Sequence, residues 1–386
     1  MSTFVLSPEH VELRAALRRF AEEGIAPNAA AADATGEYPW ASFAAYRDSG
    51  FIRLPYPEEY GGDGGDLIAY AILVEEVARV CGSSSLFVMI PRLAIEAILM
   101  FGNEEIKQRI IPKLVTGEWQ GSYCLSESGA GSDVGSMRTR AVRDGDDYVL
   151  TGSKSWITNA GISDFYTVFA KTNPDAGTRG ISAFVVEADR PGFSVAKLES
   201  KMGMRGSPTG EIRFDEVRIP AENLIGEENR GFQYAMAALD GSRPLVGAQA
   251  VGIAQGALDA ATRYVTERQQ FGQPVAEFQG VQFMLADMAT RVEAARLLVY
   301  SACTRLDAGM EGTSKAAAMA KLFASDTAMS VTTDAVQLFG GAGYTADFPV
   351  ERMMRDAKVT QIYEGTNQIQ RVVIGRRLLD DLSPTA

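Results

Sequence analysis

The stretch Asp144-Gly-Asp-Asp-Tyr-Val-Leu-Thr-Gly-Ser-Lys154 decides the fold class, because it has the pattern of a β-strand in a chain that is otherwise rich in helical patterns. Asp and Gly at its start are turn residues, and the Tyr-Val-Leu-Thr run that follows favours a strand. Similar short runs occur at 165–170, 180–186 and 211–214, separated by turn residues. We therefore expect a compact β domain between residues 122 and 230.

Helical patterns flank this β tract on both sides. Before it, Ser7-Pro8-Glu9 has the N-cap, first-turn Pro and first-turn acid of a helix start. After it, apolar residues recur every three or four positions in two stripes, which is typical of long helices packed in a bundle. The stripes are Val246, Ala250, Ile253, Ala257, Ala261 and Tyr264, and Val281, Leu285, Met288, Val292, Ala295, Val299, Ala302 and Leu306.

The order of these tracts predicts an α+β fold with three domains. We expect an N-terminal α-helical domain over residues 1–121, a small β-barrel or sandwich domain over 122–230, and a C-terminal four-helix-bundle domain over 231–386.

Composition excludes several classes of function. The 386 residues include 37 Lys and Arg against 49 Asp and Glu, a net charge of -12 that disfavours nucleic acid and anionic membranes as partners. His10 is the only histidine, so imidazole-dependent triads, dyads and zinc sites are not expected. Cys81, Cys124 and Cys303 are odd in number and far apart, which argues against a disulfide framework or a thiolate metal site. With no signal-peptide pattern at the start, we expect a cytoplasmic, metal-free protein.

Two polar motifs are candidates for ligand binding. Tyr123-Cys-Leu-Ser-Glu-Ser-Gly-Ala-Gly-Ser-Asp133 offers backbone N–H groups and the hydroxyls of Ser126 and Ser132 to an anionic or carbonyl-rich ligand, although an ordinary domain-crossing loop has the same composition. Further along, Trp156 and Thr158 are two residues apart and so share one face of a strand. A ring beside a hydroxyl suits a flat heterocycle, whereas the alternative is a core tryptophan.

Glu364 is the candidate base. It lies between Tyr363 and Gly365 in a glycine-containing segment between two helical patterns, where loss of water raises the pKa of a carboxylate. The alternative is an acid at the start of a helix, interacting with the helix dipole.

In combination, these motifs resemble those of the acyl-CoA dehydrogenase family of flavoproteins, from residue 5 to about 380. The resemblance rests on 123–133, on Trp-Ile-Thr-Asn at 156–159, on Glu-Arg-x-x-Phe-Gly at 267–272, on Gln-Leu-Phe-Gly-Gly-Ala-Gly-Tyr at 337–344, and on Arg-Asp-Ala-Lys-x-x-x-Ile-Tyr-Glu-Gly-Thr-Asn-Gln-Ile-Gln-Arg at 355–371.

The resemblance assigns roles to individual residues. The residues that it implies hold the flavin ring and ribityl chain of FAD are Tyr123, Leu125, Ser126, Gly131, Ser132, Trp156 and Thr158, with Thr366 and Gln368 as further contacts. Those that it implies reach the pyrophosphate and adenosine of FAD in a neighbouring subunit are Arg268, Phe271, Gln337 and Gly341. The implied substrate-binding residues are Ser132, Asp240 and Arg243 toward CoA, and Tyr363 and Gly365 beside the base.

The implied reaction is α,β-dehydrogenation of an acyl-CoA thioester to trans-2-enoyl-CoA. By resemblance, Glu364 takes the α-proton, a hydride passes to flavin N5, and the thioester oxygen is held by the backbone N–H of the base and a ribityl hydroxyl. Ser242 fills the position where some relatives carry the base, which places the chain with the short- and medium-chain type. Residues 87–99 are expected to line the acyl pocket, and His10 is expected to be catalytically silent.

The same resemblance implies a homotetramer, electron-transfer flavoprotein as electron acceptor, and a place in fatty-acid β-oxidation. Three alternatives stay open: an acyl-CoA oxidase, an enoyl-CoA reductase, and a non-catalytic flavin-binding or DNA-associated relative.

Overall fold

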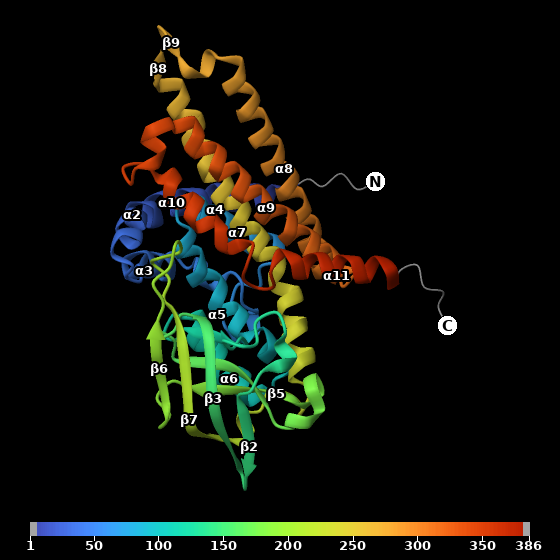
Figure 1. The fold of residues 1–386 in the computed structure, drawn as a ribbon. Helices are drawn as coiled ribbons and strands as arrows, with labels where there is room; N and C mark the ends of the chain where they lie inside the picture. The colour runs from blue at the N-terminus through green and yellow to red at the C-terminus, as the bar shows by residue number, and fades with distance from the viewer. Residues whose placement is uncertain (1–5, 381–386) are drawn as a thin grey trace.

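The computed structural model describes residues 6–380, in which helical segments lie on both sides of a β domain in sequence (Figure 1). The N-terminal helices are α1 (Pro8–Phe20), α2 (Ala26–Thr35), α3 (Trp40–Asp48), α4 (Leu67–Val80), α5 (Gly82–Phe101) and α6 (Glu104–Val115). The helices after the β domain are α7 (Gly231–Glu267), α8 (Gln279–Asp307), α9 (Thr313–Phe339), α10 (Pro349–Thr360) and α11 (Asn367–Asp380). The expected order of helical, β and helical tracts is confirmed.

The middle part is a curled sheet of seven strands. They are β1 (Gly121–Cys124), β2 (Arg140–Asp144), β3 (Asp147–Thr158), β4 (Phe165–Lys171), β5 (Ile181–Glu187), β6 (Phe193–Leu198) and β7 (Thr209–Pro220). The strand order is β1-β4-β2-β3-β7-β6, and β5 pairs with β4. The stretch 144–154 forms a hairpin turn and a strand, with Asp144 opposite Asp147 and Gly145 at φ 63°. Glycine suits this turn because it adopts positive φ without a steric cost.

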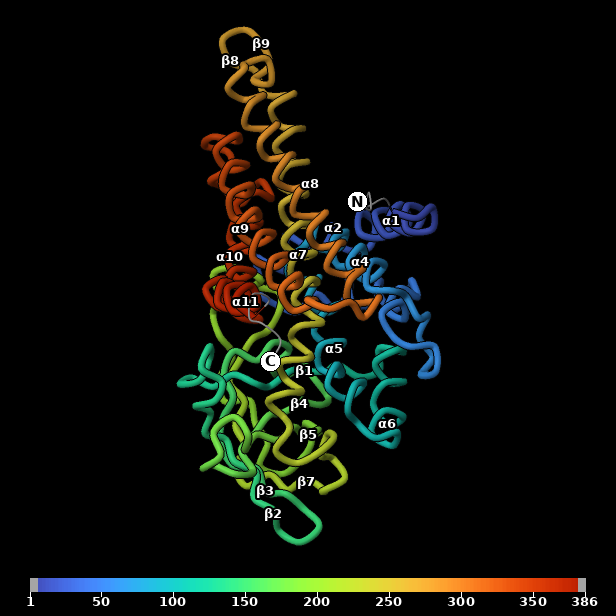
Figure 2. Tube along the Cα trace, turned by 90° about the vertical axis from the view of Figure 1, so that its right-hand side faces the viewer, coloured from blue at the N-terminus to red at the C-terminus, as the bar shows by residue number. Residues whose placement is uncertain are grey.

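The two apolar stripes form the core of the C-terminal helices. Five of the six residues of the α7 stripe are buried, and the sixth, Tyr264, is partly buried. The central residues of the α8 stripe, from Met288 to Ala302, are buried as well. Beyond the bundle, the ends of α7 and α8 continue into an arm that carries the short strands β8 (Gln269–Gln270) and β9 (Gln273–Pro274). Figure 2 shows that this arm lies at the opposite end of the molecule from the hairpin of β2 and β3.

The N-terminal helices share a core with the bundle. Helix α1 begins as expected, since the Ser7 side chain accepts a hydrogen bond from the backbone N–H of His10. Two buried carboxylates on α4 join three helices: Glu76 is paired with Arg18 of α1 at 3.0 Å, and Glu75 with Arg296 of α8 at 2.9 Å. Breaking such a pair leaves a buried charge, so these contacts fix how the two helical parts meet.

Helix α5 contacts both helical parts of the chain and the sheet. It is the one helix among residues 6–380 that is long and apolar enough to cross a membrane, and 72% of its most apolar window is buried inside the fold. One side of it packs with α4 and α7, and Ile95 and Ile98 belong to the same apolar cluster as Phe165 and Phe169 of β4. These contacts are those of a core helix.

Asp356 of α10 ties the bundle to the loop between β6 and β7. The backbone N–H of Met204 donates to Asp356 Oδ1 at 2.5 Å. Complete burial raises the pKa of Asp356 from 3.8 to about 6, and the Met204 hydrogen bond offsets part of that rise. Gly203 packs against the backbone of Arg355, where a Cβ atom would lie 2.5 Å from the carbonyl group.

We expect Asp356→Asn to gain stability relative to the wild type as the pH rises from 4 to 7. Because the folded-state pKa is raised, the folded wild type binds more protons than the unfolded chain in this window and loses stability as the carboxyl ionises. Asn keeps the acceptor for Met204 but does not ionise, so the difference should grow by up to about 3 kcal/mol. Urea unfolding at pH 4, 5, 6 and 7 gives the free energy of unfolding of both proteins. If the difference between the two free energies does not vary with pH, the pKa of Asp356 is not raised in the folded protein.

Candidate active site

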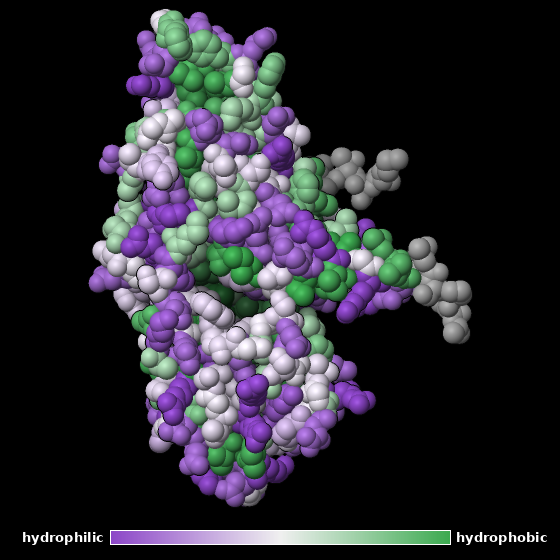
Figure 3. Space-filling view, viewed as in Figure 1, coloured by the Kyte–Doolittle hydropathy of each residue, from purple (hydrophilic) through white to green (hydrophobic). Residues whose placement is uncertain are grey.

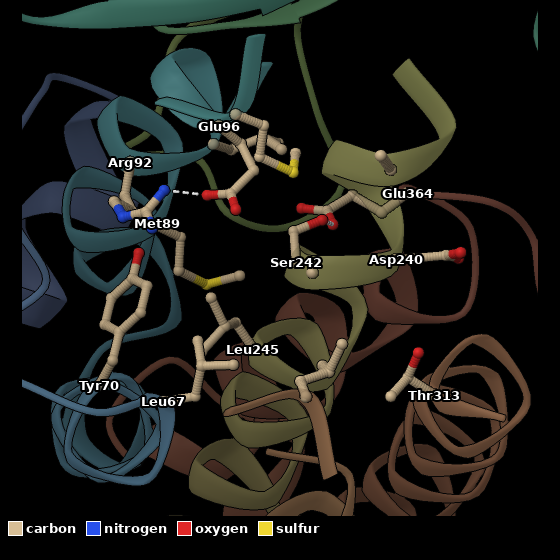
Figure 4. A pocket seen from close by; sticks show the side chains of 15 residues that line it. Leu67, Tyr70, Met89, Arg92, Glu96, Asp240, Ser242, Leu245, Thr313 and Glu364 are labelled. Carbon is tan, nitrogen blue, oxygen red and sulfur yellow. Dashed lines mark hydrogen bonds and ion pairs between the residues drawn. The ribbon is translucent and has the colours of Figure 1, made fainter. Parts of the chain in front are cut away.

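A cavity of about 370 Å³ lies among α4, α5, α7 and the ends of α8 and α9, with the segment between α10 and α11 at one side (Figure 4). Its apolar lining includes Leu67, Met89, Leu93, Met100, Leu245 and Leu306. Its polar lining includes Tyr70, Arg92, Glu96, Asp240, Ser242 and Glu364. A mostly apolar cavity with a few converging polar groups is typical of a small-molecule site. Four residues of the stretch 87–99, which is expected to line the acyl pocket, line this cavity: Met89, Arg92, Leu93 and Glu96.

Glu364 presents its carboxylate to this cavity from the segment between α10 and α11. Its Oε2 accepts a hydrogen bond from Ser242 Oγ of α7 at 2.5 Å. Burial raises the pKa of Glu364, while the Ser242 hydrogen bond and the positive charges of Lys321 and Arg243 oppose that rise. The residue precedes α11 and is hydrogen-bonded to α7, so a desolvated carboxylate describes it better than a helix-start acid.

The backbone that carries Glu364 is held in an unusual conformation by buried donors. Glu364 has φ 51° and Gly365 has φ 90°, both in the left-handed region. Lys321 Nζ of α9 donates to Gly365 O and to Asn367 Oδ1, each at 2.9 Å, and Gln370 Nε2 also donates to Gly365 O at 2.9 Å. A non-glycine residue rarely persists at positive φ unless its surroundings enforce it. These contacts therefore set the direction of the Glu364 side chain.

Lys321 is a site residue that the sequence interpretation missed. Its side chain is completely buried, and burial lowers its pKa to about 7 despite the attraction of Glu364. One signal was available in the sequence, because Lys321 stands among small residues on the buried face of its helix, beside Ala317, Ala320 and Ala324. A lysine on an otherwise apolar face requires hydrogen-bond partners in the fold.

Three of the expected substrate residues, Asp240, Arg243 and Tyr363, lie near Glu364. Arg243 is buried and paired with Asp240, and its Nε has no hydrogen-bond partner among the described residues. Its positive charge lowers the pKa of Glu364, while Asp240 lines the cavity. The Tyr363 hydroxyl donates to Gln249 of α7.

The 123–133 segment reaches the same region from the sheet. The Tyr123 hydroxyl donates to Ala235 O of α7 at 3.2 Å, and its pKa is raised by burial and by the charge of Glu364. The segment is held by a buried ion pair: Lys154 Nζ contacts Glu127 Oε1 at 2.9 Å and also donates to Leu125 O at 3.0 Å. These contacts hold the ends of the loop, while its tip at Gly131 and Ser132 stays exposed.

Trp156 provides an exposed aromatic ring beside this loop, and Thr158 provides a partly exposed hydroxyl. Trp156 is 63% exposed with φ 64°, at a register shift between β3 and β7, while Ile157 next to it is buried. The core-tryptophan alternative is therefore wrong, and Thr158 is partly exposed on the same side. The Ser126 carbonyl accepts from the backbone N–H of Ser155, which fixes the loop next to this strand. Figure 3 shows a recess between the helical bundle and the β domain, with apolar residues at its base.

The other residues expected to contact FAD lie elsewhere in the chain. Arg268 and the 93% exposed Phe271 are on the arm, and Gln337 and Gly341 are exposed at the end of α9 and just after it. The rings of Tyr264 and Phe339 are stacked, with their centroids 4.1 Å apart, and they join the arm to the end of α9. In Figure 1 the arm lies far from the β domain, so one chain does not bring the two groups of residues together.

Thr366 and Gln368 lie two and four residues after Glu364. Thr366 Oγ1 accepts from the backbone N–H of Ile369 in the first turn of α11, and the Gln368 side chain is exposed. His10 lies outside the cavity lining, between Ser7 and Asp66. Within residues 6–380, no group of three or more His, Cys, Asp or Glu side chains is placed to hold a metal ion.

Comparison with known proteins gives matches along nearly the whole chain. Three family models match: acyl-CoA dehydrogenase N-terminal domain over residues 7–118, middle domain over 122–217, and C-terminal domain over 229–379. A probable acyl-CoA dehydrogenase, fadE25 of Mycobacterium leprae, is 56% identical over 376 residues, 97% of each chain.

Solved structures agree with this. Butyryl-CoA dehydrogenase from Megasphaera elsdenii superposes with a TM-score of 0.95 at 42% identity, covering 98% of this chain and 100% of that one. A chain in the structure of the electron transferring flavoprotein of Acidaminococcus fermentans matches with a TM-score of 0.95 at 46% identity and the same coverage. The chain belongs to the acyl-CoA dehydrogenase family of flavin-dependent oxidoreductases.

Proposed function

We propose that this protein oxidises an acyl-CoA thioester to trans-2-enoyl-CoA with FAD as its cofactor and Glu364 as its base. The observation that carries the proposal is the Glu364 carboxylate itself, which lines an apolar cavity, has a raised pKa and is aimed by contacts from α7 and α9. A carboxylate with a raised pKa is a stronger base toward the weakly acidic α-proton of a thioester.

The residues near the β domain fit a flavin. Trp156 offers an exposed ring, Thr158 and Ser126 offer hydroxyls, and a Cβ atom at Gly131 would meet nothing within 4 Å, which leaves room for a ligand at the loop. Ser132, Tyr123, Leu125, Thr366 and Gln368 would complete this half of the site. The chemistry that FAD supplies there is acceptance of a hydride at flavin N5.

The protein's own groups handle the proton and the thioester oxygen. Glu364 accepts the α-proton at its carboxylate, and Ser242 keeps that carboxylate beside the cavity. The backbone N–H of Glu364 has no acceptor among the described residues, so it is available to the oxygen on which negative charge develops. Gly365, at φ 90°, lets the backbone beside Glu364 take the left-handed turn, and Asp240 is available to the CoA portion at the cavity wall.

A second copy of the chain would complete the cofactor site. Because Arg268, Phe271, Gln337 and Gly341 lie apart from the flavin-binding group of the same chain, they are free to contact FAD bound to a neighbour. This supports a homotetramer built from dimers, with three domains in each chain at 1–121, 122–230 and 231–386. We further propose that electron-transfer flavoprotein reoxidises the flavin and that the enzyme acts in the cytoplasm, in fatty-acid β-oxidation.

Anaerobic titration of the purified flavoprotein with straight-chain acyl-CoAs of increasing length tests the reaction. We expect at least one of them to bleach the oxidised flavin spectrum, and no bleaching by any acyl-CoA, unsubstituted or substituted, would refute the proposal. Peroxide yield in air, with and without electron-transfer flavoprotein, separates a dehydrogenase from an oxidase. Oxidation of the reduced enzyme by enoyl-CoA measures the reverse direction.

Removal of the Ser242 hydroxyl should shift the pH dependence of the reaction. The hydrogen bond from Ser242 lowers the pKa of Glu364, so in Ser242→Ala the carboxyl stays protonated, and therefore inactive as a base, to a higher pH. We expect the acidic limb of the kcat/KM profile to move upward by about 0.5 to 1 pH unit, given the usual strength of one hydrogen bond.

Ser242→Thr is the matched control, because it keeps a hydroxyl at the same position. It should leave the acidic limb where it is in the wild type. A profile that is identical in the Ala and Thr variants would show that Ser242 does not act on the base.

A further inference from the structure

The wall of the cavity that faces Glu364 carries an ion pair. Arg92 and Glu96 stand one turn apart on α5, and Arg92 Nη1 is bonded to Glu96 Oε2. Figure 4 shows the pair on the opposite side of the cavity from Glu364 and Ser242. The rest of the α5 surface in the cavity is apolar, with Met89, Leu93 and Met100. A charged pair is unexpected in the wall of a pocket for a hydrocarbon chain.

Both charged groups keep part of their hydrogen-bonding capacity for the cavity. Their side chains are 17% and 21% exposed. Arg92 Nε donates to Pro55 O at 2.9 Å, but Nη2 has no partner among the described residues. The free oxygen of Glu96, Oε1, lies 3.4 Å from the position that a Cβ atom of Gly241 would occupy. The cavity wall therefore offers a donor and an acceptor side by side.

Tyr70 of α4 is hydrogen-bonded to α5 beside this ion pair. The Tyr70 hydroxyl donates to Val88 O at 3.0 Å and is itself part of the cavity lining. Burial lowers the pKa of Arg92, although the guanidinium remains charged. Because the pair has no net charge, a carboxylate at the far end of a ligand would meet Glu96 and an ammonium would meet Arg92. Neither charge is favoured.

A hydrocarbon tail pressed against this wall would remove water from the free donor and acceptor without replacing its hydrogen bonds, which is unfavourable. A neutral polar group would replace them. Sites built to hydrogen-bond a substrate group discriminate strongly against analogues that lack it.

We propose that this enzyme prefers acyl groups whose far end carries a neutral hydrogen-bonding group, a hydroxyl or a keto oxygen, bound by Arg92 and Glu96. The inference rests on the proposed function, since Glu364 marks the reacting end of the acyl group.

Anaerobic flavin reduction by length-matched acyl-CoAs tests this preference. For each length from C4 to C8, the unsubstituted acyl-CoA is compared with its ω-hydroxy, (ω−1)-oxo and ω-carboxy analogues. At the length that spans the cavity, we expect kcat/KM for the hydroxy or oxo compound to exceed that for the unsubstituted compound at least tenfold, with no such gain for the carboxy compound. Equal rates for polar and unsubstituted acyl groups at every length would overturn the proposal.

Variants link the preference to the ion pair. Arg92→Leu/Glu96→Leu removes both charges and should abolish or reverse the preference, whereas Arg218→Leu/Asp144→Leu removes an exposed pair from the β domain and should leave it intact. If the first double variant does not fold, Glu96→Gln keeps the size of the side chain and should reduce the preference. A preference that is unchanged in folded Glu96→Gln and in the double variant would assign it to other residues.

The outcomes separate this inference from the proposed function. If unsubstituted acyl-CoAs bleach the flavin but polar analogues are not favoured, only the inference about Arg92 and Glu96 fails. If no acyl-CoA of either kind bleaches it, both fail.

Discussion

Glu364→Gln is expected to slow flavin reduction by acyl-CoA by several powers of ten while FAD stays bound. Gln has nearly the size of Glu and can still accept the hydrogen bond from Ser242 Oγ, so the cavity should keep its shape. It cannot accept the α-proton, and proton transfer by a positioned base typically contributes 10² to 10⁴-fold, with more lost when proton and hydride transfer depend on each other. Anaerobic stopped-flow measurement of flavin bleaching gives the rate, and the visible spectrum of the oxidised protein gives the FAD content.

His10→Gln is the control for this experiment. His10 is hydrogen-bonded to Ser7 and Asp66 and does not line the cavity, so its replacement should leave the rate within about twofold of the wild type. Near-normal bleaching by Glu364→Gln would show that another group takes the proton. A large loss in His10→Gln would contradict the expectation that the histidine is silent.

Lys321→Met is expected to lower kcat about 100-fold with a smaller effect on KM. The variant keeps the volume of the side chain but removes the donor that holds Gly365 O and Asn367 Oδ1. Gln370 Nε2 would then be the remaining side-chain donor to Gly365 O among the described residues. Misplacement of a reacting group by about 1 Å is enough for a loss of this size. Steady-state kinetics with one acyl-CoA measures the split between kcat and KM.

The pH profile separates positioning from a loss of stability. The positive charge of Lys321 opposes the rise in the pKa of Glu364, so the acidic limb of the profile should move to higher pH in Lys321→Met. Lys358→Met is the matched control, because Lys358 is exposed on α10 and its Nζ donates to the Gln361 side chain, away from Glu364 in the chain's described contacts. If Lys321→Met keeps kcat within twofold, the turn does not depend on Lys321.

Much of the fold could be predicted because its determinants are local. The Ser7 cap, the turn at Asp144-Gly145 and the apolar stripes of α7 and α8 depend on residues within a few positions of each other. Their outcome follows from backbone preferences and side-chain periodicity. The position of Glu364 between two helices followed from the same kind of signal.

The surroundings of the site could be predicted only in part. The sequence motif placed Trp156 and Thr158 on one strand face, but whether that face was core or open depended on what packs against it. Lys321 was missed, since nothing adjacent to it in the chain forms its hydrogen bonds. Arg92 and Glu96 belong to a helix that is apolar enough to resemble a membrane span, and their approach to the cavity depends on how α5 packs.

The sequence by itself determined the three tracts, the family resemblance and the identity of the candidate base. Only the tertiary structure decided how that base is tuned and what faces it. Ser242 is 122 residues from Glu364 in the chain, and Lys321 and Arg243 reach it from two different helices. The pKa of a carboxylate depends on the water, charges and hydrogen bonds within a few ångströms of it, and these are set by contacts between distant segments rather than by neighbours in sequence.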